Sequence, residues 1–312
     1  MAAERLGGGV KSGSVDGTGI GAQNGAGPFF VPSWRTARGA LALDRPRIMG
    51  VLNVTPDSFW AGSRTASVQE ALARAEVMLR AGADLLDVGG ESTRPGADAI
   101  SATEERSRIV PVVQAVLARW PETLVSVDTV KAEVAAAALD EGAAVVNDVS
   151  ALRLDPELGR VARDHGAGLV LMHSRGGVDR MALYEEAAYH DPVGQVADEL
   201  SAALERSRAA GVADDRVVLD PGLGFAKRTE HSAAVLHGLA RLARLGRPIL
   251  VGPSRKRFVG ELAGGVPVED RLPGTIAACV VALERGARIF RVHDVGPVRQ
   301  ALDVADGIRR GP

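Results

Sequence analysis

The chain alternates between short apolar runs and longer stretches with the spacing of amphipathic helices, beginning near Arg47. Each apolar run has the length of a strand. Most runs are apolar at every position, which is typical of parallel strands that helices cover on both faces. The runs predicted to be strands are residues 48–53, 85–88, 124–128, 145–148, 168–173, 217–220, 249–252 and 289–293.

The stretches between these runs carry helix start and stop signals. Glycines stand where helix C-terminal glycines belong, for example Gly82, Gly142 and Gly286. The predicted helix starts are capping boxes at Ser67 with Glu70 and at Ser101 with Glu104, and Asp-Pro pairs at 155–156 and 191–192. Eight strand–helix units in about 270 residues predict an α/β fold, a (β/α)8 TIM barrel. The competing doubly wound sheet usually has fewer strands and a Gly-rich first turn, and no G-x-G-x-x-G follows the first run.

Composition limits the remaining possibilities. Residues 1–40 are rich in Gly, Ser and Ala with little periodicity, so we expect a disordered tail followed by a single domain over 41–312. The net charge of −2 gives no general reason to expect binding to nucleic acid or an anionic membrane. No apolar run approaches membrane-spanning length, and the N-terminus lacks the apolar segment of a signal peptide. We therefore expect a cytoplasmic protein whose one cysteine, Cys279, is a buried core thiol.

Polar side chains follow every predicted strand. In a barrel of this kind the chemistry lies at the carboxyl ends of the strands, so these residues are expected to surround one active site. They are Asn53, Glu91, Asp128, Asn147, Asp148, His173, Asp220, Ser254, Lys256, Arg291 and His293. Asp128 and Asp148 could instead cap the helices that follow them, but capping does not explain polar groups at all eight strand ends.

The charges of these residues indicate a class of ligand. Lys256, Arg291 and His293 suit an anion such as phosphate. Asp128, Asn147 and Asp220 suit a flat heterocycle that donates several N–H bonds. A heterocycle with a phosphorylated arm would satisfy both groups. Residues 254–257 could place an anion at a helix start or could be a solvated basic turn. The sequence has no zinc-ligand spacing and no G-x-S-x-G nucleophile motif.

Two long polar loops follow the first two strands, at residues 55–64 and 91–98. Their length and composition suit lids that close over a substrate, although ordinary surface loops remain an alternative. The adjacent aromatic residues Phe59 and Trp60 favour the lid, because exposed neighbouring rings usually cover something.

With these motifs in order, the chain resembles the dihydropteroate synthase family, the sulfonamide target of folate biosynthesis. The resemblance runs from about Arg47 to about Ile308. The segments that carry it are residues 49–59, 90–96, 127–129, 147–148, 171–173, 220–227, 254–256 and 291–294. It implies a transferase that joins 6-hydroxymethyl-7,8-dihydropterin diphosphate to p-aminobenzoate and releases diphosphate. The implied course is dissociative: diphosphate leaves before the arylamine attacks.

The resemblance also implies roles for individual residues. The pterin would be held by Asp128, Asn147, Met172, Asp220, Phe225 and Lys256. Diphosphate would be bound by Asn53, Arg291 and His293, with Asn53 also reaching Mg²⁺. The p-aminobenzoate pocket would be formed by Phe59, Thr93, Arg94, Pro95 and Ser254, with Ser254 at the opening of a helix. Lys256, Asp128 and Asn53 are the expected catalytic residues, and a homodimer is implied.

The chain departs from the family pattern in the first loop, where Trp60-Ala61-Gly62 replaces the common Ser-Asp-Gly. This change loses a carboxylate and adds a large ring at the lid, so it bears on the expected sensitivity to sulfonamides. Two other functions are compatible with the pterin set. A methyltetrahydrofolate-dependent methyltransferase would not need the anion-binding residues, and a non-catalytic pterin-binding paralogue would not need them complete.

Overall fold

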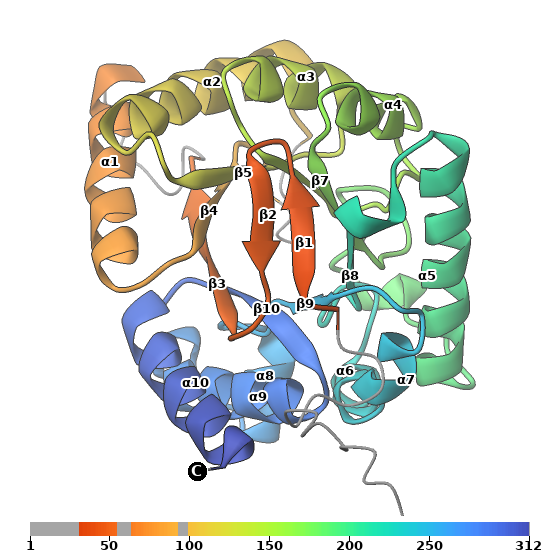
Figure 1. Ribbon diagram of the computed structural model, residues 1–312. Helices are drawn as coiled ribbons and strands as arrows, with labels where there is room; N and C mark the ends of the chain where they lie inside the picture. The colour runs from red at the N-terminus through yellow and green to blue at the C-terminus, as the bar shows by residue number, and fades with distance from the viewer. Residues whose placement is uncertain (1–30, 55–63, 93–98, 312) are drawn as a thin grey trace, which may run out of the picture.

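The structure is a computed structural model that describes residues 31–54, 64–92 and 99–311. Eight parallel strands form a closed barrel in the order β10-β3-β4-β5-β6-β7-β8-β9, and helices surround it (Figure 1). The barrel strands are β3 (Arg47–Asn53), β4 (Leu85–Gly89), β5 (Leu124–Asp128), β6 (Val145–Asp148), β7 (Gly168–Met172), β8 (Val217–Asp220), β9 (Ile249–Val251) and β10 (Ala287–Val292). The predicted TIM barrel is confirmed, and each strand lies within two residues of its predicted bounds.

The helices fill the intervals between the strands. They are α1 (Arg64–Arg80), α2 (Ala102–Arg119), α3 (Ala132–Asp140), α4 (Glu157–Asp164), α5 (Pro192–Ala209), α6 (Thr229–His237), α7 (Leu239–Ala243), α8 (Arg257–Leu262), α9 (Leu272–Glu284) and α10 (Val295–Arg310). Short 3-10 helices are η2 (Tyr184–Glu186), η3 (Asp214–Arg216) and η4 (Val268–Asp270). Among the described residues, no helix combines the length and the apolar character needed to cross a membrane.

Some predicted helix starts are confirmed and one is wrong. The Ser101 hydroxyl accepts the Glu104 amide at 3.2 Å, and the Asp191 carboxylate accepts the Gly194 amide at 3.0 Å. At 155–156 the helix begins one residue later than predicted, since Pro156 is the N-cap of α4 and the helix starts at Glu157, whose amide Asp155 accepts at 3.1 Å. Asp155 also caps α3 by accepting the Ala132 amide at 2.8 Å. The capping box at Ser67 is wrong, because α1 already begins at Arg64.

A hairpin precedes the barrel and changes the expected domain boundary. Strands β1 (Ser33–Thr36) and β2 (Gly39–Ala42) pair in antiparallel fashion and lie across one end of the barrel (Figure 1). The Trp34 side chain is 0 % exposed, and its Nε1 donates to the Arg216 carbonyl at 2.7 Å. Gly168 allows this close approach, since a Cβ there would lie 2.9 Å from the ring. The described domain therefore includes residues 33–40, which the sequence analysis assigned to the tail because they lack periodicity. Residues 1–30 lie outside the described part of the chain.

The barrel interior changes from apolar to polar along its axis. Near the hairpin, one layer of buried side chains packs with Trp34 and consists of Met49, Leu85, Val145, Val170, Val218, Leu250 and Ile289. Successive side chains of a strand alternate between faces, so inward positions recur every second residue. Two residues further along these strands the inward positions include Asp87, Asn147, Asp220 and Arg291. The apolar layer supports the barrel from below, and the polar layer forms the floor of a site at the carboxyl ends.

Candidate active site

An arginine joins two carboxylates at the floor of the barrel mouth. Arg291 on β10 donates from Nε to Asp87 Oδ2 and from Nη2 to Asp128 Oδ2, both at 2.6 Å. Asn147 on β6 donates from Nδ2 to the same Asp87 oxygen at 3.0 Å. Strands β4, β5, β6 and β10 thus contribute to one hydrogen-bonded group, in which Asp128 and Asn147 were predicted site neighbours.

The charges in this group perturb one another. Burial raises the pKa of Asp128 to about 7, an effect that Arg291 opposes and that the negative charge of Asp87 reinforces. Burial disfavours the Arg291 cation, but Asp87 and Asp128 nevertheless raise its pKa above the usual value. Asp128 therefore changes protonation near neutral pH while Arg291 stays charged.

Lys256, after β9, and Asp220, at the end of β8, influence each other's charge. The Lys256 ammonium lies 4.0 Å from the centroid of the Phe225 ring and donates to the Leu223 carbonyl. Burial lowers the pKa of Lys256 to about 7, although the Asp220 carboxylate favours its charged form. Burial likewise raises the pKa of Asp220, against the opposing charge of Lys256. The Asp220 Oδ1 accepts the Gly222 amide at 2.7 Å, which fixes the carboxylate against its own loop.

Apolar side chains complete the site. Met172 on β7 packs with Val130, Val149 and Met181, and Phe225 lies against this cluster. The predicted pterin residues therefore provide acceptors, a cation and apolar surface, the combination that suits a flat heterocycle.

Of the predicted diphosphate residues, Arg291 belongs to the floor, and His293 and Asn53 lie at the ends of β10 and β3. The Ser254 Oγ lies 3.0 Å from His293 Nδ1 and accepts the His293 backbone amide at 3.2 Å. Helix α8 begins at Arg257, so Ser254 lies in the preceding turn and does not open the helix as expected. Asn53 ends β3, and its amide makes no hydrogen bond to another described residue. Its oxygen can therefore serve a ligand.

The comparisons with known proteins agree with this geometry. A family model described as "Pterin binding enzyme" matches residues 49–293. A dihydropteroate synthase of Synechocystis sp. is 42 % identical over 266 residues, which span 85 % of this chain and 91 % of that protein. The chain belongs to the dihydropteroate synthase family.

Solved structures of the family superpose closely on this chain. A Xanthomonas albilineans dihydropteroate synthase with 4-aminobenzoic acid has a TM-score of 0.83 at 42 % identity, covering 90 % of this chain and 99 % of its own. A structure of the enzyme from the same organism with 7,8-dihydropteroate has a TM-score of 0.80 at 39 % identity, covering 90 % and 100 %. The recognition made from the sequence motifs is confirmed.

Not every polar strand end of this synthase-family barrel points into the site. Asp148 accepts the amide and hydroxyl of Ser150 at 2.8 and 2.7 Å and also the Leu152 amide, so it caps its own turn. The Glu91 carboxylate is held by Lys131 at 2.9 Å and by the Ile100 amide at 2.9 Å. These two carboxylates support loops.

The basic residues on either side of Lys256 form ion pairs with other residues. Arg255 pairs with Asp294 at 2.6 Å, and Arg257 pairs with Glu261 at 2.5 Å on the exposed side of α8. The interpretation of residues 254–257 as a phosphate cradle is therefore not supported, and Lys256 is the cation that faces the site. The expected lid and p-aminobenzoate residues Phe59, Trp60, Thr93, Arg94 and Pro95 lie outside the described residues.

A buried lysine supports the loop that carries Phe225. Lys227 is 1 % exposed, and its Nζ lies 2.7 Å from His173 Nδ1 and 3.1 Å from both the Gly222 and Phe225 carbonyls. Burial lowers the pKa of Lys227, yet three acceptors match the three N–H bonds of an ammonium. Burial, aided by this cation, lowers the pKa of His173 to about 4, so the imidazole is neutral and Nε2 bonds Glu199 at 3.0 Å.

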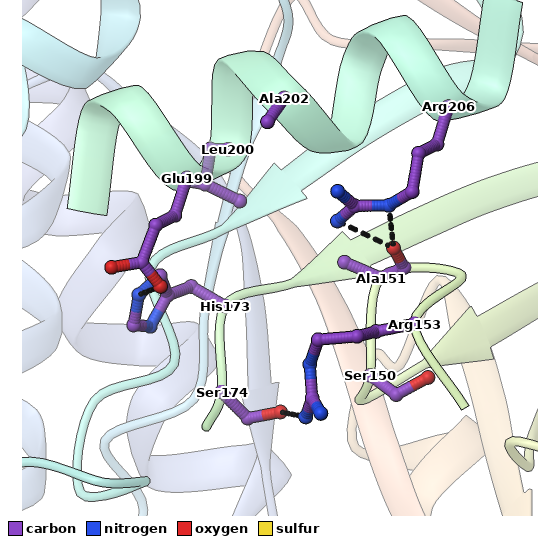
Figure 2. Close-up of a pocket in the computed structure, with 9 residues that line it drawn as sticks. All are labelled: Ser150, Ala151, Arg153, His173, Ser174, Glu199, Leu200, Ala202 and Arg206. Atoms are coloured by element: carbon purple, nitrogen blue, oxygen red, sulfur yellow. Dashed lines mark hydrogen bonds and ion pairs between the residues drawn. The ribbon is translucent and has the colours of Figure 1, made fainter. Parts of the chain in front are cut away.

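The His173 ring is thus held by Lys227 at one nitrogen and by Glu199 at the other. It borders a cavity of about 150 Å³ between α5 and the ends of β6 and β7 (Figure 2). In Figure 2 Arg206 extends from α5 to the Ala151 carbonyl, which its Nη2 reaches at 3.0 Å. Arg153 similarly donates to the Gly176 carbonyl at 2.6 Å. These arginines tie loops together, and the cavity lies outside the site at the barrel mouth.

The sequence predicted the buried environment of Cys279 but gave no role to Asp87. The predicted core thiol is confirmed: Cys279 is 0 % exposed, and burial raises its pKa to about 12. Asp87 was not assigned a role because it lies inside a predicted strand. Its inward position, in step with Asn147, Asp220 and Arg291, was the available signal.

Proposed function

We propose that the chain condenses 6-hydroxymethyl-7,8-dihydropterin diphosphate with p-aminobenzoate to give 7,8-dihydropteroate and diphosphate. The observation that carries the proposal is the convergence of Asp128, Asn147, Asp220, Lys256 and Arg291 from separate strands on one polar floor. Family membership and the printed ligands of the X. albilineans structures support the same reaction.

The pterin ring is assigned to the floor. Asp220 and Asn147 accept N–H bonds from its edge, and the Lys256 ammonium donates to a ring acceptor. Met172 and Phe225 contact its faces. This donor and acceptor pattern gives specificity, because a buried polar group left without a partner costs about 1–3 kcal/mol.

The diphosphate arm is assigned to Asn53, Arg291 and His293. Arg291 keeps a donor for it, since Nη1 makes no hydrogen bond to another described residue while Nε and Nη2 hold the two carboxylates. Ser254 orients the His293 imidazole through the 3.0 Å contact with Nδ1. Ser254 is also the proposed neighbour of the p-aminobenzoate carboxylate.

Mg²⁺ is proposed to accompany the diphosphate. The described residues contain no group of three or more His, Cys, Asp or Glu side chains that could hold a metal by themselves. The side-chain amide oxygen of Asn53, which has no hydrogen-bond partner among the described residues, fits an ion that keeps several waters and is bound mainly by substrate phosphates. When bound, Mg²⁺ supplies neutralisation of the charge on the leaving diphosphate.

The reaction is proposed to be dissociative. The bond between the pterin methylene carbon and the diphosphate oxygen breaks, and the electron pair leaves with diphosphate. The Asp128 carboxylate lies where it can stabilise positive charge on the pterin, and Arg291 and His293 stabilise the departing anion. The neutral p-aminobenzoate nitrogen then attacks the methylene carbon and loses a proton to solvent. No group needs to deprotonate the arylamine beforehand.

We further propose a cytoplasmic homodimer. Support for an interface on the α9–α10 side comes from exposed apolar side chains there, with Val281 38 %, Val304 59 % and Ile308 78 % exposed. Size-exclusion chromatography with light scattering tests this: the dimer mass is expected, and a monomer at micromolar concentration would refute it.

The function is tested by diphosphate release from the purified full chain with pterin diphosphate, Mg²⁺ and p-aminobenzoate. We expect turnover that requires p-aminobenzoate and yields 7,8-dihydropteroate by mass spectrometry. Tight pterin binding without release would indicate a non-catalytic pterin-binding protein. Methyl transfer from methyltetrahydrofolate without diphosphate release would indicate a methyltransferase.

A further inference from the structure

Every hydrogen bond that the Asp87 side chain makes with a described residue goes to a residue of the candidate site. Its side chain is 0 % exposed on β4, and its Oδ2 accepts both Arg291 Nε at 2.6 Å and Asn147 Nδ2 at 3.0 Å. Its Oδ1 is buried and has no hydrogen-bond partner among the described residues. No scaffold amide or scaffold side chain in the described chain is bonded to this carboxylate.

Asp84, the residue immediately before β4, shows what a scaffold carboxylate looks like here. Its oxygens accept the Ile48 amide at 2.8 Å and pair with Arg45 at 2.6 Å and Arg47 at 2.9 Å. These contacts join segments at the opposite end of the barrel from the site. The side chains of both aspartates are buried. They differ in their partners, because Asp87 bonds residues of the site and Asp84 bonds residues at the other end of the barrel.

The bond from Asn147 to Asp87 fixes which way the amide faces. An amide can be turned so that either its oxygen or its NH₂ points at a ligand. Because Nδ2 is used by Asp87, Asn147 presents its oxygen to the barrel mouth and can accept an N–H bond. Reversing the amide would bring its oxygen against a carboxylate oxygen, which is repulsive.

The bond from Arg291 to Asp87 fixes the guanidinium in the same way. With Nε on Asp87 and Nη2 on Asp128, the planar fork bridges two carboxylates and has little rotational freedom. Nη1 is then the part of the guanidinium that is not used by the floor.

We propose that Asp87 is a positioning residue of the condensation: it holds Arg291 across Asp128 and turns the Asn147 oxygen toward the pterin. This proposal rests on the proposed function for its substrate. Asp87 acts through Arg291 and Asn147, and its charge also acts on Asp128.

The electrostatic consequence is measurable without substrate. The charged groups that face Asp128 are Arg291, Asp87, Glu105, Asp148 and Lys256. Arg291 favours the ionised form of Asp128, whereas Asp87, Glu105 and Asp148 disfavour it. Removing the Asp87 charge therefore lowers the pKa of Asp128, because Arg291 keeps its own ion pair with Asp128 while its Nε loses the partner that sets its orientation.

The test compares Asp87→Asn with the control Asp84→Asn, which also loses one buried carboxylate charge. For Asp87→Asn we expect kcat/KM for pterin diphosphate to fall about 10- to 100-fold, by analogy with residues that orient metal ligands through hydrogen bonds. KM for p-aminobenzoate should change less than about 2-fold, and the low-pH limb of kcat/KM should move to lower pH. Asp84→Asn should lower Tm but leave kcat/KM and its pH profile as in wild type. Equal behaviour of the two variants would overturn the proposal.

A second experiment measures binding, so its result depends neither on loss of folded protein nor on turnover. The double variant Asp87→Asn/Arg291→Gln removes both charges, so no unpaired buried arginine remains. If Asp87 acts in part through Arg291, the loss of affinity in the double variant should be smaller than the sum of the losses in Asp87→Asn and Arg291→Gln; additive losses would contradict this.

Carboxyl ¹³C NMR titration of Asp128, assigned with Asp128→Asn, provides the substrate-free readout. A lower Asp128 pKa in Asp87→Asn is expected, and an unchanged value overturns the electrostatic part. If wild type shows no diphosphate release but the titration shifts as expected, the proposed function fails while the Asp87 network stands.

Discussion

The ammonium of Lys256 lies 4.0 Å from the centroid of the Phe225 ring, so a loop after β9 meets a loop after β8 through a cation and an aromatic face. A cation over a ring gains about 0.5–2 kcal/mol, and more as water is excluded. The same Nζ bonds the Leu223 carbonyl. The contact places the Lys256 charge beside the surface proposed to hold the pterin face.

Replacing Lys256 by Ala should abolish turnover while the protein remains folded. The charge that favours ionised Asp220 and the donor to the pterin ring are both lost, and we expect kcat/KM to fall at least about 100-fold, as for a preorganised donor in a site that excludes water. Diphosphate release gives the rate and circular dichroism the fold. Arg257→Ala is the matched control, since its ion pair with Glu261 lies on the surface of α8. Near-normal activity of Lys256→Ala would remove this residue from the site.

The pH profile should have a maximum near neutrality. Asp128 must be ionised to stabilise positive charge, and burial raises its pKa to about 7, so kcat/KM rises as pH increases toward 7. Lys256 must be protonated to donate, and burial lowers its pKa to about 7, so kcat/KM falls above that pH. Steady-state kinetics between about pH 5 and pH 9, corrected for substrate ionisation, measure both limbs. Asp128→Asn should lose the low-pH limb, and a flat wild-type profile would contradict both assignments.

Lys227→Met should destabilise the fold and weaken pterin binding together. The substitution leaves the Gly222 and Phe225 carbonyls and His173 Nδ1 without their donor, at a cost of about 1–3 kcal/mol for each unsatisfied group. Urea unfolding measures the stability, and calorimetry measures binding of pterin diphosphate. The neighbouring exposed residue provides the control Arg228→Met. Wild-type affinity in a destabilised Lys227→Met protein would show that the lysine serves the scaffold alone.

Trp34→Ala tests the hairpin at the far end of the barrel. Removing a fully buried tryptophan costs about 3–5 kcal/mol, because a large apolar side chain and its bond to Arg216 are lost. We expect a lower free energy of unfolding and unchanged kcat/KM under conditions where the protein is folded. Arg35→Ala on the same strand, with its exposed partner Asp215, should change the stability by less than about 1 kcal/mol. Unfolding curves for the two variants that coincide would show that the hairpin does not support the barrel.

Local patterns made the barrel predictable from the sequence. The strands are mostly apolar runs, and some of the helices between them have start signals, as Ser101 and Asp191 show. The hairpin was not predictable from such patterns, because Trp34 is stabilised by contacts with Gly168 and Arg216, more than 130 positions away. The predicted helix start at Ser67 was wrong because a capping sequence can also occur inside a helix.

Residues of the site were predictable where a polar side chain lies at the end of an apolar run. Asp128, Asn147, Asp220 and Lys256 are polar groups next to apolar runs, and the barrel topology brings them together. Asp148 has the same sequence signature yet bonds its own turn, since only the fold decides where a carboxylate points. Asp87 and Lys227 have their roles through partners far along the chain, so side-chain geometry was needed to recognise them.

Calorimetric titration with 6-hydroxymethyl-7,8-dihydropterin diphosphate and Mg²⁺ tests the central claim that the polar floor is the pterin site. The account predicts binding at one site per chain by wild type, and affinity at least about 10-fold weaker for Asp220→Asn, which loses a charged acceptor worth about 1.5–3 kcal/mol. The variant should stay folded, because removing the Asp220 charge also removes the burial cost that raises its pKa. Equal affinity of wild type and a folded Asp220→Asn protein would contradict the account.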